Sequence, residues 1–396
     1  MRSMLEGVRI IDLTTHVAGP GCTSFLCDLG AEVIKVEKPG CGDKARLFPP
    51  FMGSQSVSFA ALNRGKKGIT LDLKKREGVS LFKELIFKSD VLVEDFQPGT
   101  MEKFGLSYAQ LKKINPKLVM CAITGYGQYG PLASQPAYDA IIQGVSGLMS
   151  AGNTPNNPAT NADAVIVDIS SAMYAAFSIC AALFARGKSG EGEYLDVAKL
   201  DVAIQLLEGR LMDVNLSGNG SNPENASYPS AMPFGPFITS DGRVILLFDE
   251  DGLFQRLCAT MQQPKLSEDP RFSDAVSRNR HAAELKTIIE QWTRKHRTDT
   301  LLQKLQAGGV PCAPVNEVNQ LFEHPHIAAR EMIVSIHQPG AGMIQIFGLA
   351  LKALNSRVCI RGAAPELGAD NRMVLEKILK KSGPEIAEIQ KSGVMG

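Results

Sequence analysis

Two aspartates carry the clearest potential for chemistry in this chain of 396 residues. Asp168 follows the apolar run 164–167 and precedes a segment with helical spacing of apolar residues, and Asp139 follows Tyr138 ahead of another apolar run. Free backbone N–H groups and the helix dipole stabilise an acidic side chain at a helix N-terminus. Two neighbouring carboxylates raise the pKa of one of them. The residues alone therefore leave two interpretations for each aspartate, a structural helix cap or a chemical role. The chemical role of Asp139 would be to orient the substrate or to tune the charge near Asp168.

The elements that would position these aspartates begin near the N-terminus. Residues 8–13 predict a buried strand, 19–29 a helix and 32–37 a second strand, which together make a βαβ unit. The first turn, from Thr14 to Pro20, lacks the three spaced glycines that let a backbone approach a pyrophosphate. This argues against a nicotinamide oxidoreductase.

The next elements continue the alternation of strands and helices. Strands are predicted at 68–73, 91–94 and 118–123, and a helix at 75–88. Such alternation is typical of an α/β protein with a doubly wound parallel sheet. After Asp168, apolar residues recur at helical spacing from Ser170 to Arg186 and stop at Gly187, which predicts a buried helix.

Composition narrows the class of protein. The 42 Lys and Arg residues nearly balance the 41 Asp and Glu residues, so no overall field favours nucleic acid or an anionic membrane. No apolar run approaches the length of a membrane span, and the first residues contain no signal region, which predicts a cytoplasmic protein. Eight scattered cysteines form no C-x-x-C pair and have no histidine at ligand spacing, so we expect neither a metal site nor a disulfide framework.

The length favours two domains. Residues 216–230 are polar and rich in turn formers, and 237–248 predict a β-hairpin turning at Asp241 and Gly242, followed by helices to about Leu305. We therefore assign 1–205 to the first part of a large domain, 206–230 to a linker and 231–310 to a small α+β domain. Residues 311–330 form a second linker, and 331–396 return to the large domain.

The N-terminal stretches 5–20 and 28–40 resemble, nearly residue for residue, the class III CoA-transferases of the CaiB/BaiF type. This family contains formyl-CoA, carnitine and bile-acid CoA-transferases and also the α-methylacyl-CoA racemases. Segments 310–316 and 364–368 match the family as well, so the resemblance covers nearly the whole chain. It implies a discontinuous large domain with a parallel sheet, an inserted smaller domain, and a homodimer of interlocked subunits.

The resemblance gives Asp168 the role of nucleophile. It implies that CoA moves from an acyl-CoA donor to a free carboxylic acid through aspartyl anhydrides and an aspartyl-CoA thioester, which divides one hard exchange into easier steps. Asp139 and Tyr138 would orient the substrate. Racemases of the family carry histidine where this chain has Tyr138, and a tyrosine is a poor proton shuttle at neutral pH, so a transferase is favoured.

The same resemblance implies a set of CoA contacts. These residues are His16, Val17, Ala18, Lys38, Leu71, Asp95, Phe96 and Lys103. CoA and acyl-CoA would be substrates, and no permanently bound cofactor is expected.

Two departures from the family pattern bear on the substrate. Val17 stands where formyl-CoA transferases have glutamine, and the run of four glycines in their small domain is missing. These differences argue against formyl or oxalyl substrates and leave oxyanion stabilisation to other backbone amides, near Gly127 or in the loop 234–236. Carnitine-like, bile-acid, hydroxy-acid and dicarboxylic acceptors stay open, as do two alternative functions, an α-methylacyl-CoA racemase and a CoA-binding protein without turnover.

Overall fold

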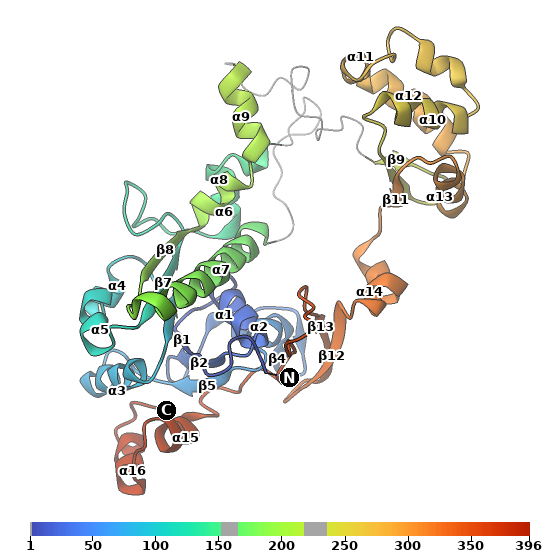
Figure 1. Cartoon of the computed structure of the whole chain (residues 1–396). Helices are drawn as coiled ribbons and strands as arrows, with labels where there is room; N and C mark the ends of the chain where they lie inside the picture. The colour runs from blue at the N-terminus through green and yellow to red at the C-terminus, as the bar shows by residue number, and fades with distance from the viewer. Residues whose placement is uncertain (1, 152–164, 218–235) are drawn as a thin grey trace. The chain divides into compact units, whose positions relative to one another are not determined.

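A computed structural model describes residues 2–151, 165–217 and 236–396 (Figure 1). The chain divides into two compact units, Met1–Leu207 with Pro325–Gly396, and Glu208–His324. The first unit is a mixed α/β structure around a central parallel sheet, as the sequence predicted.

The central sheet contains six parallel strands in the order β5-β2-β1-β6-β7-β8. The strands are β1 (Arg9–Asp12), β2 (Glu32–Glu37), β5 (Lys67–Thr70), β6 (Val91–Glu94), β7 (Val119–Thr124) and β8 (Tyr194–Ala198). The order reverses between β1 and β6, which are direct neighbours. In sheets of this kind, ligands bind outside the carboxyl ends of the strands at the point of reversal.

Helices cover both faces of this sheet. Alternate strand residues point to opposite faces, so Ile10 packs with α1 (Ala18–Asp28) and α7 (Ile166–Ser189), whereas Ile11 packs with α3 (Arg76–Phe87) and the C-terminal helices. The other helices of this unit are α2 (Val57–Asn63), α4 (Thr100–Lys103), α5 (Tyr108–Ile114), α6 (Asp139–Val145), α8 (Lys199–Gln205), α14 (Pro325–Ala329), α15 (Asn371–Met373) and α16 (Gly383–Lys391), with short turns η1 (Lys44–Leu47), η2 (Leu148–Ser150) and η6 (Val374–Ile378).

Two features of the second half of this unit differ from the sequence prediction. Helix α7 begins at Ile166 rather than Ser170, and it continues past Gly187 to Ser189, where Gly190 ends it with a φ of 74°. Strand β8 was not predicted.

By length and composition α7 is the single helix in the described ranges that could cross a membrane, but 44% of its most apolar window is buried within the fold.

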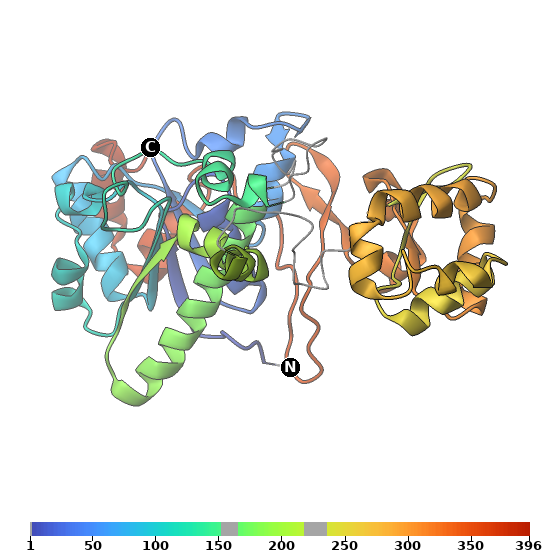
Figure 2. The same cartoon turned by 90° about the horizontal axis from the view of Figure 1, so that it is seen from above.

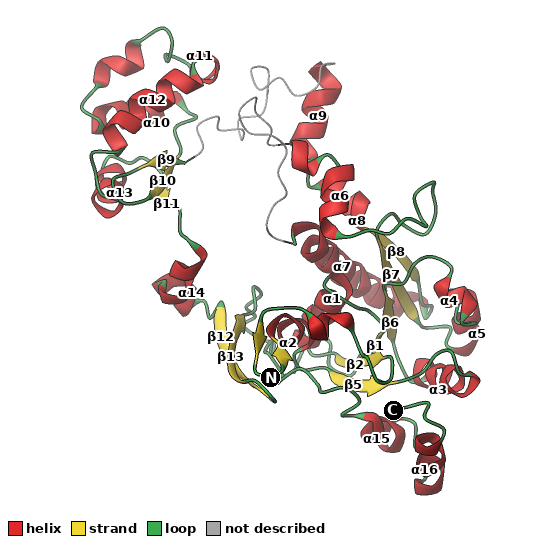
Figure 3. Ribbon diagram, turned by 180° about the vertical axis from the view of Figure 1, so that it is seen from behind, coloured by secondary structure: helices red, strands yellow, loops and turns green. Residues whose placement is uncertain are grey.

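The C-terminal segment closes the edge of the sheet at β5. The Gly68 amide donates to Asp370 Oδ2 at 2.8 Å, and the Thr70 amide donates to Asn371 Oδ1 at 2.9 Å. Two antiparallel ribbons complete the unit. One is β3 (Phe51–Met52) with β4 (Gln55–Ser56), and the other is β12 (Ile333–Gln338) with β13 (Gly342–Phe347), which lie side by side in Figure 3.

The second unit has its own core around Phe237, Phe248 and Phe254. Its three-stranded antiparallel sheet contains β9 (Phe237–Ile238), β10 (Arg243–Leu246) and β11 (Cys312–Pro314), which confirms the predicted hairpin. Its helices gather around this sheet (Figure 2) and are α10 (Asp251–Thr260), α11 (Ala275–Arg280), α12 (Ala282–Thr293) and α13 (Thr298–Ala307), with η4 (Pro264–Glu268).

Both segments that we predicted as linkers contain secondary structure. Within 206–230, residues Glu208–Ser217 form helix α9, and residues 218–230 lie outside the described ranges. Within 311–330 lie β11, η5 (Val318–Glu323) and α14. Apolar residues at helical spacing, such as Leu211 and Val214, allow α9 to form in a segment whose later half is dominated by turn residues.

Candidate active site

A pocket of about 560 Å³ lies in the first unit at the carboxyl ends of the central strands. Loops after β1, β6 and β7 and the first residues of α6, α7 and α8 provide its walls. The lining residues are Thr15, His16, Val17, Phe48, Asp95, Phe96, Gln97, Pro98, Ile123, Thr124, Gly125, Ala133, Gln135, Pro136, Ala137, Tyr138, Asp139, Ala140, Val165, Asp168 and Lys199. This is where the strand order predicts a ligand.

Asp139 and Asp168 meet in this pocket although 29 residues separate them in sequence. Asp168 is the third residue of α7, and Asp139 is the first residue of α6. Asp139 Oδ2 accepts the backbone N–H of Asp168 at 2.8 Å, and its Oδ1 accepts a hydrogen bond from Gln143 Nε2. Asp139 therefore satisfies one of the free N–H groups that begin α7, and it fixes the backbone that carries Asp168.

Lys199 supplies the counter-charge for Asp168. Its Nζ lies 2.6 Å from Asp168 Oδ1, and both side chains are largely buried. The contact is an ion pair without hydrogen-bond alignment, because Asp168 Oδ1 has no hydrogen-bond partner among the described residues. Sequence reasoning missed Lys199, whose position depends on the unpredicted strand β8 that it follows directly.

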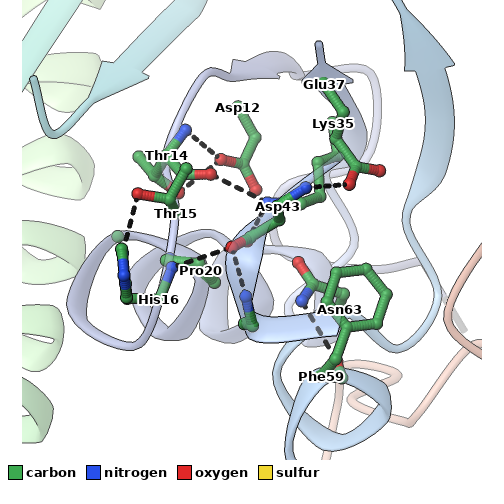
Figure 4. A network of polar contacts seen from close by, with 12 residues as sticks. Asp12, Thr14, Thr15, His16, Pro20, Lys35, Glu37, Asp43, Phe59 and Asn63 are labelled. Atoms are coloured by element: carbon green, nitrogen blue, oxygen red, sulfur yellow. Dashed lines mark hydrogen bonds and ion pairs between the residues drawn. The ribbon is translucent and has the colours of Figure 1, made fainter. Parts of the chain in front are cut away.

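The turn after β1 forms the opposite wall. His16 has a φ of 65°. Its amide donates to Asp43 Oδ1 at 3.2 Å, and its Nδ1 lies 3.0 Å from Thr15 Oγ1. Figure 4 shows His16 next to Thr15. Asp95, at the end of β6, accepts the Thr15 amide at 2.8 Å. Burial raises the pKa of Asp95 to about 7 and that of the neighbouring Glu94 to about 8.

Buried ion pairs hold the residues of this turn, and Figure 4 shows Lys35 beside Asp43. Lys35 Nζ lies 3.0 Å from Asp43 Oδ2 and donates to the Thr14 carbonyl at 2.8 Å, and Lys66 Nζ donates to Asp12 Oδ2 at 2.9 Å. Burial alone would raise the pKa of Asp12, but the two ammonium groups outweigh it and lower that pKa far below its usual value. The turn is thus held by charges that are fully enclosed and paired.

The structure brings most of the predicted site residues together. Asp168, Asp139, Tyr138, His16, Val17, Asp95 and Phe96 line the pocket. Ala18 and Leu71 are instead buried in the two cores that flank the sheet, and Lys38 is exposed outside the lining. The contacts of all these residues with CoA stay predictions.

Lys103 lies in a different, basic hollow of about 610 Å³ on the first unit. Lys74, Arg76 and Lys83 share this hollow with it, and Phe104 and Val79 add an apolar wall. A cluster of cations beside an apolar surface is suited to a phosphorylated ligand with an aromatic group.

We expected an oxyanion donor near Gly127 or in the loop 234–236. The Gly127 amide donates to Thr124 Oγ1 at 3.0 Å, and Gly127 does not belong to the pocket lining. Phe234 and Gly235 lie outside the described residues. Within the described ranges no group of three or more His, Cys, Asp or Glu side chains is arranged for a metal ion.

Comparisons with known proteins all match this chain to CoA-transferases or to proteins of the CaiB/BaiF family. Residues 5–371 match the model of CoA-transferase family III. The chain is 35% identical over 383 residues to the succinate–glutarate CoA-transferase of Agrobacterium fabrum, covering 94% of this chain and 95% of that protein. It is 36% identical over 330 residues to the acetyl-CoA:oxalate CoA-transferase of Acetobacter aceti, covering 83% and 85%. The crystal structure of a CaiB/BaiF family protein from Brucella suis superposes with a TM-score of 0.83 at 31% identity, over 94% of this chain and 99% of that one.

Proposed function

The chain belongs to CoA-transferase family III and is an enzyme of that class, and on this premise we propose that Asp168 is the nucleophile that carries CoA between two acids. The observation that carries the proposal is the position of the Asp168 carboxylate. It lies in the pocket at the carboxyl edge of the sheet, paired with Lys199 and anchored through its amide by Asp139.

The proposed reaction needs four displacements. The Asp168 carboxylate attacks the carbonyl carbon of the donor thioester, the C–S bond breaks, and CoA leaves as a thiolate. The thiolate then attacks the Asp168 carbonyl of the resulting anhydride, which forms aspartyl-CoA and expels the donor acid as a carboxylate. The acceptor carboxylate attacks aspartyl-CoA and releases the thiolate again. The thiolate finally attacks the acceptor carbonyl of the second anhydride and restores the free Asp168 carboxylate.

This cycle matches the charges of the site. Each step exchanges one anion for another, carboxylate for thiolate, and no proton has to move. An ionised Asp168 is therefore the form that reacts, and the Lys199 Nζ atom lies 2.6 Å from its Oδ1.

We place the reacting end of CoA in the pocket, against His16, Val17, Asp95 and Phe96. The phosphate groups would bind near Lys38 and in the basic hollow that contains Lys103. CoA enters and leaves as a substrate in this proposal.

We propose short dicarboxylic acids as substrates, with succinyl-CoA as the first donor to test. Succinate, glutarate and oxalate, the acids named for the two relatives, are all dicarboxylic. Oxalate should be tested as well. Val17 and the missing glycine run argue against oxalyl substrates, whereas the Acetobacter enzyme, which is similar to this chain, is named for oxalate.

We also propose a cytoplasmic homodimer, with the interlocked arrangement that the family resemblance implies. Support comes from α7, whose face away from the sheet exposes Phe177 and Phe184 by 68% and 71%. Apolar side chains exposed this far commonly mark a surface that a second subunit covers.

The test is to trap the covalent intermediate. The enzyme is mixed with succinyl-CoA, quenched with hydroxylamine or borohydride, and digested for mass spectrometry. We expect a modified peptide containing Asp168 and none from Asp168→Ala, which serves as the control. An unmodified Asp168 together with uptake of solvent deuterium at the α-carbon would instead indicate a racemase.

A further inference from the structure

Lys199 is the one lysine or arginine among the described residues that line the pocket. Its side chain is 15% exposed, that of its partner Asp168 is 10% exposed, and 2.6 Å separates the charged atoms. An ammonium group removed from water to this extent depends on a nearby anion, because losing its partner leaves a charge without compensation.

The anion that pairs with Lys199 disappears during the proposed reaction. Once the Asp168 oxygen or carbonyl carbon is bonded to an acyl group or to sulfur, the side chain carries no charge. The other two carboxylates of the pocket already have partners. Asp139 accepts hydrogen bonds from the Asp168 amide and from Gln143, and Asp95 accepts the Thr15 amide.

We propose that Lys199 binds the carboxylate of the acceptor acid, and that it becomes available for this only when Asp168 has been converted to aspartyl-CoA. This inference rests on the proposed covalent function. In the free enzyme the ion pair with Asp168 occupies the Lys199 ammonium, and conversion of Asp168 to aspartyl-CoA frees that ammonium for the acid.

The geometry places the bound acid where it must react. Nζ lies 2.6 Å from an oxygen of the very carboxyl group that becomes the aspartyl-CoA carbonyl. A carboxylate held by Nζ therefore lies next to the group that it attacks, from where it can approach the carbonyl carbon to the roughly 3–3.5 Å of a near-attack arrangement. One acid oxygen bonds to the carbonyl carbon, the C–S bond breaks, and the negative charge leaves on the thiolate.

Such an exchange of partners by Lys199 would make the acceptor acid bind after aspartyl-CoA has formed. The free enzyme binds the acid weakly, because the acid must compete with Asp168 for Lys199, and the acylated enzyme binds it well. The donor acid leaves past the same ammonium, since the second half of the cycle is the reverse of the first with a different acid.

The test separates binding of the acid from formation of the intermediate. Aspartyl-CoA is formed with succinyl-CoA on the wild type, on Lys199→Met, which keeps chain length without charge, and on Lys199→Arg, which keeps the charge. Each intermediate is then discharged with increasing glutarate or with hydroxylamine, a neutral nucleophile that needs no cation. Circular dichroism checks that the variants are folded.

We expect the half-saturating glutarate concentration to rise about 10- to 100-fold in Lys199→Met, the size expected for one lost charged hydrogen bond. Discharge by hydroxylamine reports any activation of the carbonyl by the same ammonium and should fall less than discharge by glutarate, and Lys199→Arg should recover part of the glutarate binding. Equal half-saturating concentrations in wild type and Lys199→Met would overturn the inference, and so would an equal loss with hydroxylamine, which indicates a structural role.

Two further outcomes are distinguishable. If Lys199→Met does not fold, Lys199→Gln against Lys199→Arg makes the same comparison between a neutral and a charged side chain. If the wild type forms no Asp168 adduct, the proposed covalent function itself fails, whereas an adduct that discharges independently of Lys199 refutes this inference alone.

Discussion

Asp139 stabilises the first turn of α7 from another helix, through the 2.8 Å hydrogen bond that its Oδ2 accepts from the Asp168 amide. We expect Asp139→Ala to lower the free energy of unfolding by about 1 kcal/mol. Turnover should fall further, by about 10- to 100-fold, because a displaced nucleophile loses its attack geometry. Urea unfolding and steady-state CoA transfer measure the two effects.

The matched control for this prediction is Asp139→Asn, which keeps one oxygen that can accept the Asp168 amide. It should retain most of the stability that the alanine variant loses. Equal losses in both variants would show that the negative charge of Asp139, and not its hydrogen bond, is the important property.

Asp95 makes stability depend on pH. Its folded-state pKa of about 7 lies above the ordinary value of 3.8, mainly because of burial, while Lys35 and Lys199 act in the opposite direction. Between these two pKa values the folded state binds more protons than the unfolded state, so the free energy of unfolding falls as pH rises. We expect a decrease of about 1 kcal/mol from pH 6 to pH 8 for this group.

Asp95→Asn tests this pH dependence, because asparagine can still accept the Thr15 amide but does not titrate. Urea unfolding at pH 6 and pH 8 should show a smaller change for the variant than for the wild type. Glu94, whose pKa is about 8, adds a change of the same sign in both proteins. An identical pH dependence of wild type and variant would contradict the assignment to Asp95.

At the scale of elements, α7 is positioned by small residues packed against α1. Ala172 is fully buried, one turn after Asp168, and its Cβ lies 3.2 Å from where a side-chain carbon at Gly21 would be. Ala172→Leu should therefore destabilise the protein by about 1–3 kcal/mol, as overpacked core positions do. Ala109→Leu, at an exposed alanine of α5 away from the α7 face, is the control and should change stability little. Chemical denaturation measures the free energy of unfolding of both variants, and equal losses would contradict the role of Ala172 in packing.

The sequence predicted the elements whose patterns are local. Buried strands such as β6 and β7 are continuous apolar runs, and the hairpin turn at Asp241 and Gly242 has its own signature. Strand β8 escaped prediction because the polar Asp196 and flanking glycines leave a short, mixed pattern at an edge of the sheet.

The site was predicted only where it depends on residue type. The two aspartates were identified, but the start of α7 was placed four residues late, because 164–167 is an apolar run that gives no helix-starting signal. The partner of the Asp168 amide is Asp139, 29 residues earlier, and Lys199 follows an unpredicted strand. Such tertiary partners leave no mark in local spacing.

At the scale of the whole molecule, the exposed apolar face of α7 predicts assembly. We expect the wild type to have twice the 42.7 kDa mass of one chain by light scattering after size-exclusion chromatography. Phe177→Glu should shift the population toward monomer, because it places a charge on an apolar contact surface. Phe87→Glu is the matched control on α3, at a side chain that is 60% exposed. A monomeric wild type, or equal effects of both variants, would contradict a dimer formed through α7.

The contacts of Asp370 and Asn371 with β5 have a consequence for biosynthesis. Strand β5 is made early, yet the residues that cover its edge follow it by about 300 positions. During translation this edge stays open, and an open strand edge is a surface for mispairing. The unit Glu208–His324 leaves the ribosome complete before the covering residues are made. The inserted unit can therefore fold during synthesis, whereas the unit that begins the chain can close its sheet only near the end.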